Sequence, residues 1–224
     1  VGAGPRLEPA LERWLMAGAG RAAPCQKRIE TSISWVFLYP DVVLKLKKPV
    51  NFGFVDFSTL EKRGWAARRE LDFNRATAPH IYRAVRAITR HGQGDFALGG
   101  DGEVAEWALE MRRFDETAVL SEQPELAAGE FAEDLGRSIA QMHARASPGS
   151  KGGGAQGIRY VAASNARQLR QLGAGLDAAQ VERLLATTGK AIEAHAALLD
   201  ERLQSGFVRR CHGDLHRGNI LVEN

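Results

Sequence analysis

A carboxylate and a carboxamide lie five positions apart near the end of the chain, at Asp214 and Asn219. Transfer of a phosphoryl group to a hydroxyl needs such a pair, because the carboxylate accepts the hydroxyl proton and the carboxamide oxygen binds magnesium. This spacing alone occurs by chance in many chains, but here His-Gly precedes the Asp and Ile-Leu-Val follows the Asn. The pattern therefore predicts Asp214 as a general base and Asn219 as a magnesium ligand.

Two other interpretations of this segment stay open. The segment is also compatible with a polar surface turn in which Gly213 and Gly218 only bend the chain. His212 and His216 have the H-x3-H spacing that binds zinc on a helix, as in metal-dependent hydrolases. The two glycines disfavour a helix, and the glutamate of an HExxH motif is absent. We therefore expect His212 to hold the loop by packing and hydrogen bonding.

Length and composition are those of an ordinary globular protein and exclude several classes. The 224 residues allow one large domain or two small lobes, with 44% hydrophobic and 25% charged residues. A net charge of +3 does not indicate binding to nucleic acid or to an anionic membrane. We expect no membrane-spanning segment, no secretory signal and no bridge between Cys25 and Cys211, which predicts a cytoplasmic protein.

The first half of the chain has the pattern of strands around one helix. Ser58-Thr59-Leu60-Glu61 reads as a capping box, which predicts a helix beginning at Ser58 and running to about Ala76. In the run from Val42 to Leu46, alternation places Lys45 and Lys47 on one face of a strand. The other expected elements are a helix at 6–19 and strands at 33–38, 42–46, 82–89 and 104–111, the last two around a glycine-rich turn.

The second half is predicted to be helical. Helices are expected at 130–144 and 160–172, separated by a flexible glycine-rich loop at 147–154, and as one long helix at 177–204 with His195 on its apolar face. A strand-rich half followed by a helical half predicts an α+β protein of two lobes. The predicted lobes are residues 1–113 and 114–224, hinged near residues 112–117.

Three segments resemble a known family. The stretch His212–Leu221 resembles the catalytic loop of the aminoglycoside phosphotransferase family, relatives of the protein kinases with the same two-lobed fold. Residues 30–38 (ETSISWVFL) and 45–63 (KLKKPVNFGFVDFSTLEKR) resemble a bacterial branch that is often fused to a C-terminal P-loop ATP-binding domain. The resemblance runs from about residue 25 to the end. It implies ATP and Mg²⁺ as cofactors and a small molecule with a hydroxyl as acceptor.

The resemblance also implies a lysine on the third strand that binds the ATP phosphates and pairs with a helix glutamate. The run VVLK ends at Lys45 and has the shape of the family's lysine motif, while Lys47 on the same face is the alternative. Lys48 is expected to point away. Glu70 is the expected partner of Lys45, because Glu61 is assigned to the capping box.

No GxGxxG motif covers the phosphates. In the resemblance that place falls on the turn with Thr31, Ser32 and Ser34, whose hydroxyl and backbone N–H groups would cradle the phosphates. The hinge that binds adenine through backbone groups falls at residues 110–112, around Met111.

In this family a further Asp after the Asn binds magnesium, and only residues 220–224 follow Asn219. We therefore expect the helical lobe to be incomplete and the chain to be nearly inactive by itself. The leading hypothesis is an ATP- and magnesium-dependent phosphotransferase with Asp214 as base. The alternative is a non-catalytic, kinase-like nucleotide-binding module that regulates an attached ATPase domain. The presence of a base favours the enzyme.

Overall fold

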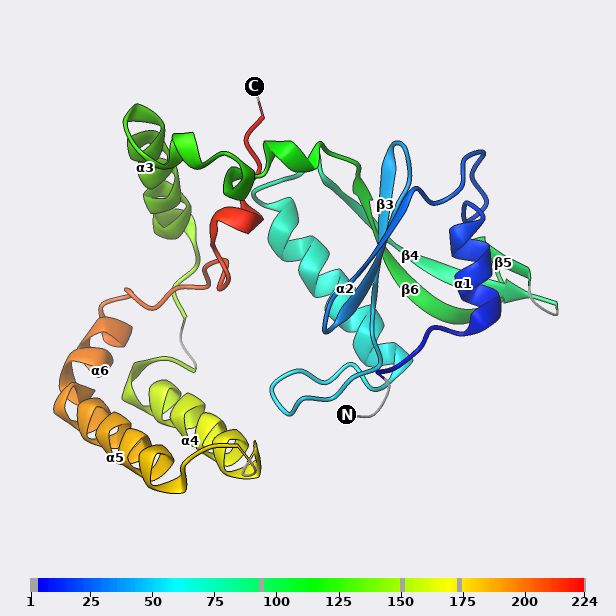
Figure 1. Ribbon diagram of the computed structural model, residues 1–224. Coiled ribbons are helices and arrows are strands. Elements are labelled where there is room, and N and C mark those ends of the chain that lie inside the picture. Colours follow the sequence, from blue (N-terminus) through cyan, green and yellow to red (C-terminus); the bar gives the residue numbers. More distant parts are fainter. Residues whose placement is uncertain (1–3, 93–94, 150–151, 173–174, 224) are drawn as a thin grey trace. The chain divides into compact units, whose positions relative to one another are not determined.

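The computed structural model describes residues 4–92, 95–149, 152–172 and 175–223. The chain forms two compact units (Figure 1), the first made of Val1–Glu122 with Leu221–Asn224 and the second of Gln123–Ile220. The division of the lobes at residue 113 stays a prediction. Part of the expected flexible loop, residues 150–151, lies outside the described residues.

A six-stranded antiparallel sheet forms the first unit. Its strand order is β1-β2-β3-β6-β4-β5. The strands are β1 Lys27–Glu30, β2 Ser34–Leu38, β3 Val42–Lys47, β4 Tyr82–His91, β5 Asp95–Leu98 and β6 Glu103–Arg112. The four strands predicted from the sequence are confirmed, each within two residues of its observed ends. The two strands at the sheet edges, β1 and β5, are only four residues long and were not predicted.

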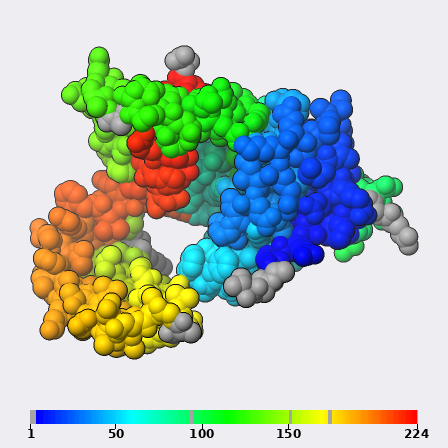
Figure 2. All heavy atoms as spheres, in the orientation of Figure 1, coloured from blue at the N-terminus to red at the C-terminus, as the bar shows by residue number. Residues whose placement is uncertain are grey.

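Helix α1, Pro9–Met16, covers one face of the sheet (Figure 1). Its Leu11 and Leu15 are fully buried against a cluster formed by Trp35, Phe37, Leu44, Leu46 and Ile88. The Tyr39 hydroxyl donates a hydrogen bond to the Leu15 carbonyl at 2.8 Å, which fixes the helix end. In the space-filling view the same helix, in blue, forms part of the surface turned to the viewer (Figure 2).

Helix α2, Leu60–Arg75, covers the opposite face and contacts β3, β4 and β6. A second cluster lies on this side, with Val43, Leu109 and Met111 among its buried residues. The expected alternation in β3 is confirmed, because Val42, Leu44 and Leu46 pack on the α1 side. Lys45 and Lys47 therefore extend toward α2.

The predicted capping box is wrong by one residue. Thr59 is the N-cap of α2, and its hydroxyl accepts a hydrogen bond from the Lys62 N–H. Ser58 instead donates both its N–H and its hydroxyl to the Asp56 carboxylate. Because Asp56 engages Ser58, the helix begins at Leu60.

Gly64 permits the close approach of α2 to the sheet. A Cβ atom at Gly64 would lie 2.6 Å from Nε1 and 2.8 Å from Cδ1 of Trp107. We expect Gly64→Ala to lower the free energy of unfolding of the first unit by about 1–3 kcal/mol, in spite of alanine's better helix propensity. Gly136, in a helix of the second unit, has open space at its Cβ position, so Gly136→Ala is expected to stabilise by about 1 kcal/mol.

Urea unfolding followed by tryptophan fluorescence and far-UV circular dichroism measures both changes. Equal effects of the two substitutions would contradict the close contact at Trp107.

Helices form the second unit. They are α3 Glu130–Arg145, α4 Gly154–Leu172, α5 Ala178–Ala194 and α6 Ala196–Gln204, and the chain also has short 3-10 helices at η1 Glu116–Ala118, η2 Leu120–Glu122, η3 Pro124–Ala127 and η4 Arg217–Asn219. A strand-rich part followed by a helical part confirms the predicted α+β class.

The single helix predicted at 177–204 is wrong, because it breaks at His195, where φ is −109° and ψ is 6°. Both halves contact α4. Arg159 of α4 forms a two-pronged ion pair with Glu193 of α5, and the Asp200 carboxylate of α6 accepts the Ala155 N–H at 2.8 Å. The bend at His195 allows both halves to pack on the same helix.

Candidate active site

Glu70 binds two lysines of β3. The Lys45 ammonium donates to Glu70 Oε1 at 2.8 Å, and the Lys47 ammonium donates to Oε2. The predicted pair of Lys45 and Glu70 is therefore present, and Lys47 shares its partner. Lys48 extends elsewhere, as expected, and pairs with Glu30 at 2.6 Å. Whether Lys45 binds phosphate stays a prediction.

The two lysine side chains differ in how deeply they are buried. The Lys47 side chain is 9% exposed, whereas that of Lys45 is 28% exposed. Burial lowers the pKa of Lys47, against the opposing effect of the Glu70 charge. Burial also acts to raise the pKa of Glu70, but Lys45 and then Lys47 outweigh it and hold the pKa below its ordinary value. Glu70 is therefore a carboxylate at neutral pH.

Strand register and helix packing place these three residues together. Lys45 lies between Val36 of β2 and Leu109 of β6, and it shares a sheet face with them. Glu70 lies in the third turn of α2, which packs on this face. Tyr82 is close enough for burial and the Glu70 charge to raise its pKa to about 12.

In the turn between β1 and β2, several polar groups form hydrogen bonds with one another. The Thr31 hydroxyl accepts the N–H groups of Ser34 at 2.9 Å and Ile33 at 3.4 Å. Ser34 is fully buried, and in the described part of the chain its hydroxyl has no hydrogen-bond partner. Ser32 is exposed. The role of Thr31, Ser32 and Ser34 in cradling phosphates stays a prediction.

Asp214 and Asn219 meet on one bend of the second unit. The Asn219 side-chain nitrogen donates to the Asp214 carbonyl at 2.8 Å and to its carboxylate Oδ2 at 3.3 Å. Gly213, at φ +81°, and the short helix η4 make the bend. The carboxylate and the carboxamide therefore lie together on this bend, while their roles as base and magnesium ligand stay predictions.

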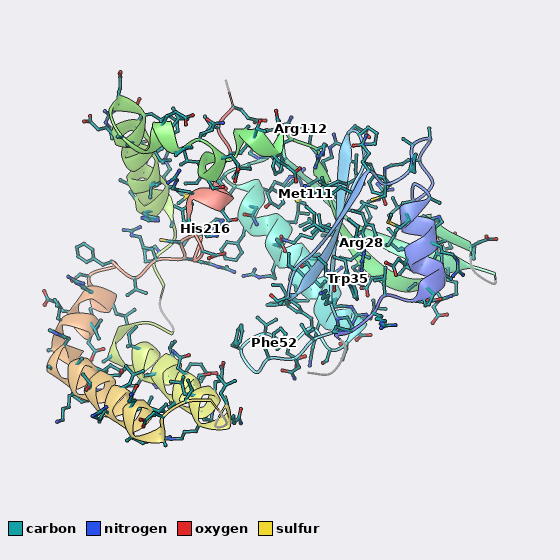
Figure 3. All side chains as sticks on the ribbon, in the orientation of Figure 1. Arg28, Trp35, Phe52, Met111, Arg112 and His216 are labelled. Atoms are coloured by element: carbon teal, nitrogen blue, oxygen red, sulfur yellow. The ribbon has the colours of Figure 1, made fainter. Side chains whose placement is uncertain are left out.

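Two histidines organise this bend. His212 Nδ1 accepts the Asp214 N–H at 3.3 Å, in line with its expected structural role. His216, labelled in Figure 3, caps η4 by accepting the Gly218 N–H on Nδ1 at 3.1 Å. His216 Nε2 lies 3.1 Å from the Asn219 side-chain nitrogen and 3.8 Å from Asp214 Oδ2, so this histidine adjoins both residues of the bend. The sequence pattern indicated no role for His216 outside zinc binding.

The zinc alternative finds no support in the structure. His212 and His216 do not lie on an α-helix. In the described residues, no group of three or more His, Cys, Asp or Glu side chains is arranged to hold a metal ion.

Both cysteines are free. No helix in the described part of the chain is long and apolar enough to cross a membrane.

Met111 lies near the end of β6 and belongs to the buried cluster under α2 (Figure 3). The neighbouring Arg112 forms an ion pair with Glu223, whose carboxylate also lies 2.5 Å from His80 Nε2. Leu221 and Val222 join the same unit through a bridge to Val119 and a hydrogen bond to the Ala118 carbonyl. Binding of adenine at residues 110–112 stays a prediction.

Comparisons with known proteins identify one family. Residues 56–224, more than half of the chain, match the family described as "Phosphotransferase enzyme family". Searches of the curated proteins and of the solved structures found no significant match. The matched region contains both Glu70 and the bend with Asp214 and Asn219, and a sheet unit followed by a helical unit is consistent with the two-lobed, kinase-like fold of this family. The chain therefore belongs to the phosphotransferase enzyme family, the aminoglycoside-phosphotransferase-like relatives of the protein kinases.

Proposed function

We propose that the chain carries an ATP- and Mg²⁺-dependent phosphotransferase site that transfers the terminal phosphoryl group to a hydroxyl of a small molecule. The observation that carries this proposal is the contact between Asp214 and Asn219 across one bend. A module that only binds nucleotide has no need of a carboxylate beside a carboxamide metal ligand.

The chemistry of the side chains fits both cofactors. The Asn219 side-chain nitrogen donates to Asp214, which leaves the carboxamide oxygen for a cation, and oxygen is the ligand atom that Mg²⁺ prefers. Lys45, Lys47 and Glu70 together carry a net charge of +1 and therefore favour phosphate. Bound Mg²⁺ would neutralise part of the phosphate charge.

Each residue then has a definite task. The Lys45 ammonium binds phosphate oxygens, and Glu70 holds that ammonium in place. Asp214 orients the acceptor hydroxyl and takes its proton as the new P–O bond forms and the bond from the terminal phosphorus to the leaving diphosphate breaks. His212 and His216 keep the bend in shape.

The first test is nucleotide binding by isothermal titration calorimetry. The chain should bind ATP with Mg²⁺, and Lys45→Met should weaken binding by about tenfold or more, because a charge-assisted contact to phosphate is lost. The matched control is Lys27→Met, an exposed lysine of β1 that pairs with Glu116. A wild-type chain with no measurable affinity for ATP would overturn the proposal.

A further inference from the structure

Lys47 is a nearly buried lysine in an unusual setting. Its side chain is 9% exposed, and its ammonium donates to Glu70 Oε2 and lies over the ring of Phe57, 5.4 Å from the ring centroid. Burial of an ammonium is costly unless a partner compensates it. The Glu70 carboxylate supplies most of this compensation, so the position of each group depends on the other.

The two lysines hold different oxygens of one carboxylate. Lys45 binds Oε1 and Lys47 binds Oε2, and both come from the same strand face. A carboxylate bound at one oxygen can still rotate about its side-chain bonds, whereas a carboxylate bound at both oxygens is fixed. Lys47 is the more buried anchor, and Lys45 is the more exposed one.

We propose that Lys47 is a positioning residue that holds Glu70 from the buried side, so that Glu70 presents the Lys45 ammonium to the phosphate groups of the nucleotide. This inference rests on the proposed function. One N–H of Lys45 is used on Glu70, and an ammonium has three. Two donors of Lys45 are then available for phosphate oxygens. Lys47 itself does not touch the nucleotide.

Lys48 is a closely matched control. Its side chain is 7% exposed where that of Lys47 is 9% exposed, and an aromatic ring, Trp35, lies 5.7 Å from its Nζ. Its carboxylate partner is Glu30, which belongs to β1. Lys48→Met therefore removes a similarly buried ammonium without changing the contacts of Glu70.

The test is a double-mutant cycle on ATP affinity, measured by calorimetry with Mg²⁺. Lys47→Met is expected to weaken binding about tenfold, which is the loss expected when Lys45 is no longer held, and Lys48→Met less than about twofold. In a Lys45→Met background, Lys47→Met should cause no further loss, because Lys47 acts through Lys45. A full loss in that background, or an equal loss in Lys48→Met, would overturn the inference.

A second readout does not depend on nucleotide. Crystal structures of the Lys47→Met and Lys48→Met chains should show the Glu70 carboxylate displaced from Lys45 only in the first. An unmoved Glu70 in Lys47→Met overturns the inference even if ATP binds. A wild-type chain that binds no ATP overturns the proposed function, while the crystal structures still decide the position of Glu70.

Folding of the variants is checked by circular dichroism. If Lys47→Met does not fold, Lys47→Arg carries the test, because its guanidinium can still donate to Glu70. Lys47→Arg should keep ATP affinity within about threefold of wild type. A loss as large as that of Lys45→Met would contradict a positioning role.

Discussion

Replacing Asp214 with alanine is expected to lower the rate of phosphoryl transfer by about 10³-fold while ATP affinity stays within about twofold, because general base catalysis typically contributes 10²–10⁴-fold. The bend should survive the change. The backbone N–H of Asp214 donates to His212 and its carbonyl accepts from Asn219, and alanine retains both groups. The measurement is kcat for formation of the phosphorylated acceptor by the protein that carries this chain. The control is Asp101→Ala, which changes an exposed aspartate.

This variant also separates the two candidate functions. A non-catalytic module that regulates an attached ATPase would keep its effect on that domain in Asp214→Ala, since no proton transfer is involved. Unchanged phosphotransfer in Asp214→Ala would contradict the role of Asp214 as base.

Replacing Glu70 with alanine is expected to cost about 3–5 kcal/mol of unfolding free energy in the first unit, the range observed when a buried ion pair loses one partner. The nearly buried ammonium of Lys47 would be left without a carboxylate. ATP affinity should fall as well, because Lys45 loses the same partner. Asp72→Ala, an exposed position on the same helix, is the control and should change stability by less than about 0.5 kcal/mol.

The effect of Glu70 should depend on pH in a defined direction. The pKa of Glu70 is lower in the folded chain than its ordinary value of 4.5, so its stabilisation is fully present above pH 4.5. It should disappear as the pH falls through the folded pKa. The difference in urea midpoint between wild type and Glu70→Gln should therefore shrink below pH 4.5, and a difference that grows on acidification would contradict the ion pair.

Periodicity predicted the elements that carry strong apolar patterns. It failed where tertiary contacts determine whether an element forms and where it begins or breaks. Strands β2 and β3 alternate clearly and were located, whereas β1 and β5 have four residues each at the sheet edges, too few for a pattern. The helix break at His195 follows from packing on α4, and the flanking sequence Ala-His-Ala gives no local signal for it. Thr59 and not Ser58 is the N-cap, because the Ser58 hydroxyl donates a hydrogen bond to the carboxylate of Asp56, two residues earlier.

Sequence patterns located the lysines of the site on one strand face and the glutamate on one helix, but they did not specify the contacts between them. Alternation placed Lys45 and Lys47 on one face of a strand, and the assignment of Glu61 to the capping box left Glu70 as the partner, which the contacts of both lysines confirm. The sequence did not show that both lysines share this carboxylate, because strand spacing specifies a face and not a partner. The capping role of His216 was also missed, since its bond to Gly218 depends on the local turn.

The most direct measurement of the central claim is a crystal structure of the chain with Mg²⁺ and a non-hydrolysable ATP analogue. We expect a phosphate oxygen within about 3 Å of Lys45 Nζ, with Glu70 still bound to that lysine, and the cation on the Asn219 carboxamide oxygen. A nucleotide bound away from Lys45, or a cation that Asn219 does not touch, would contradict it.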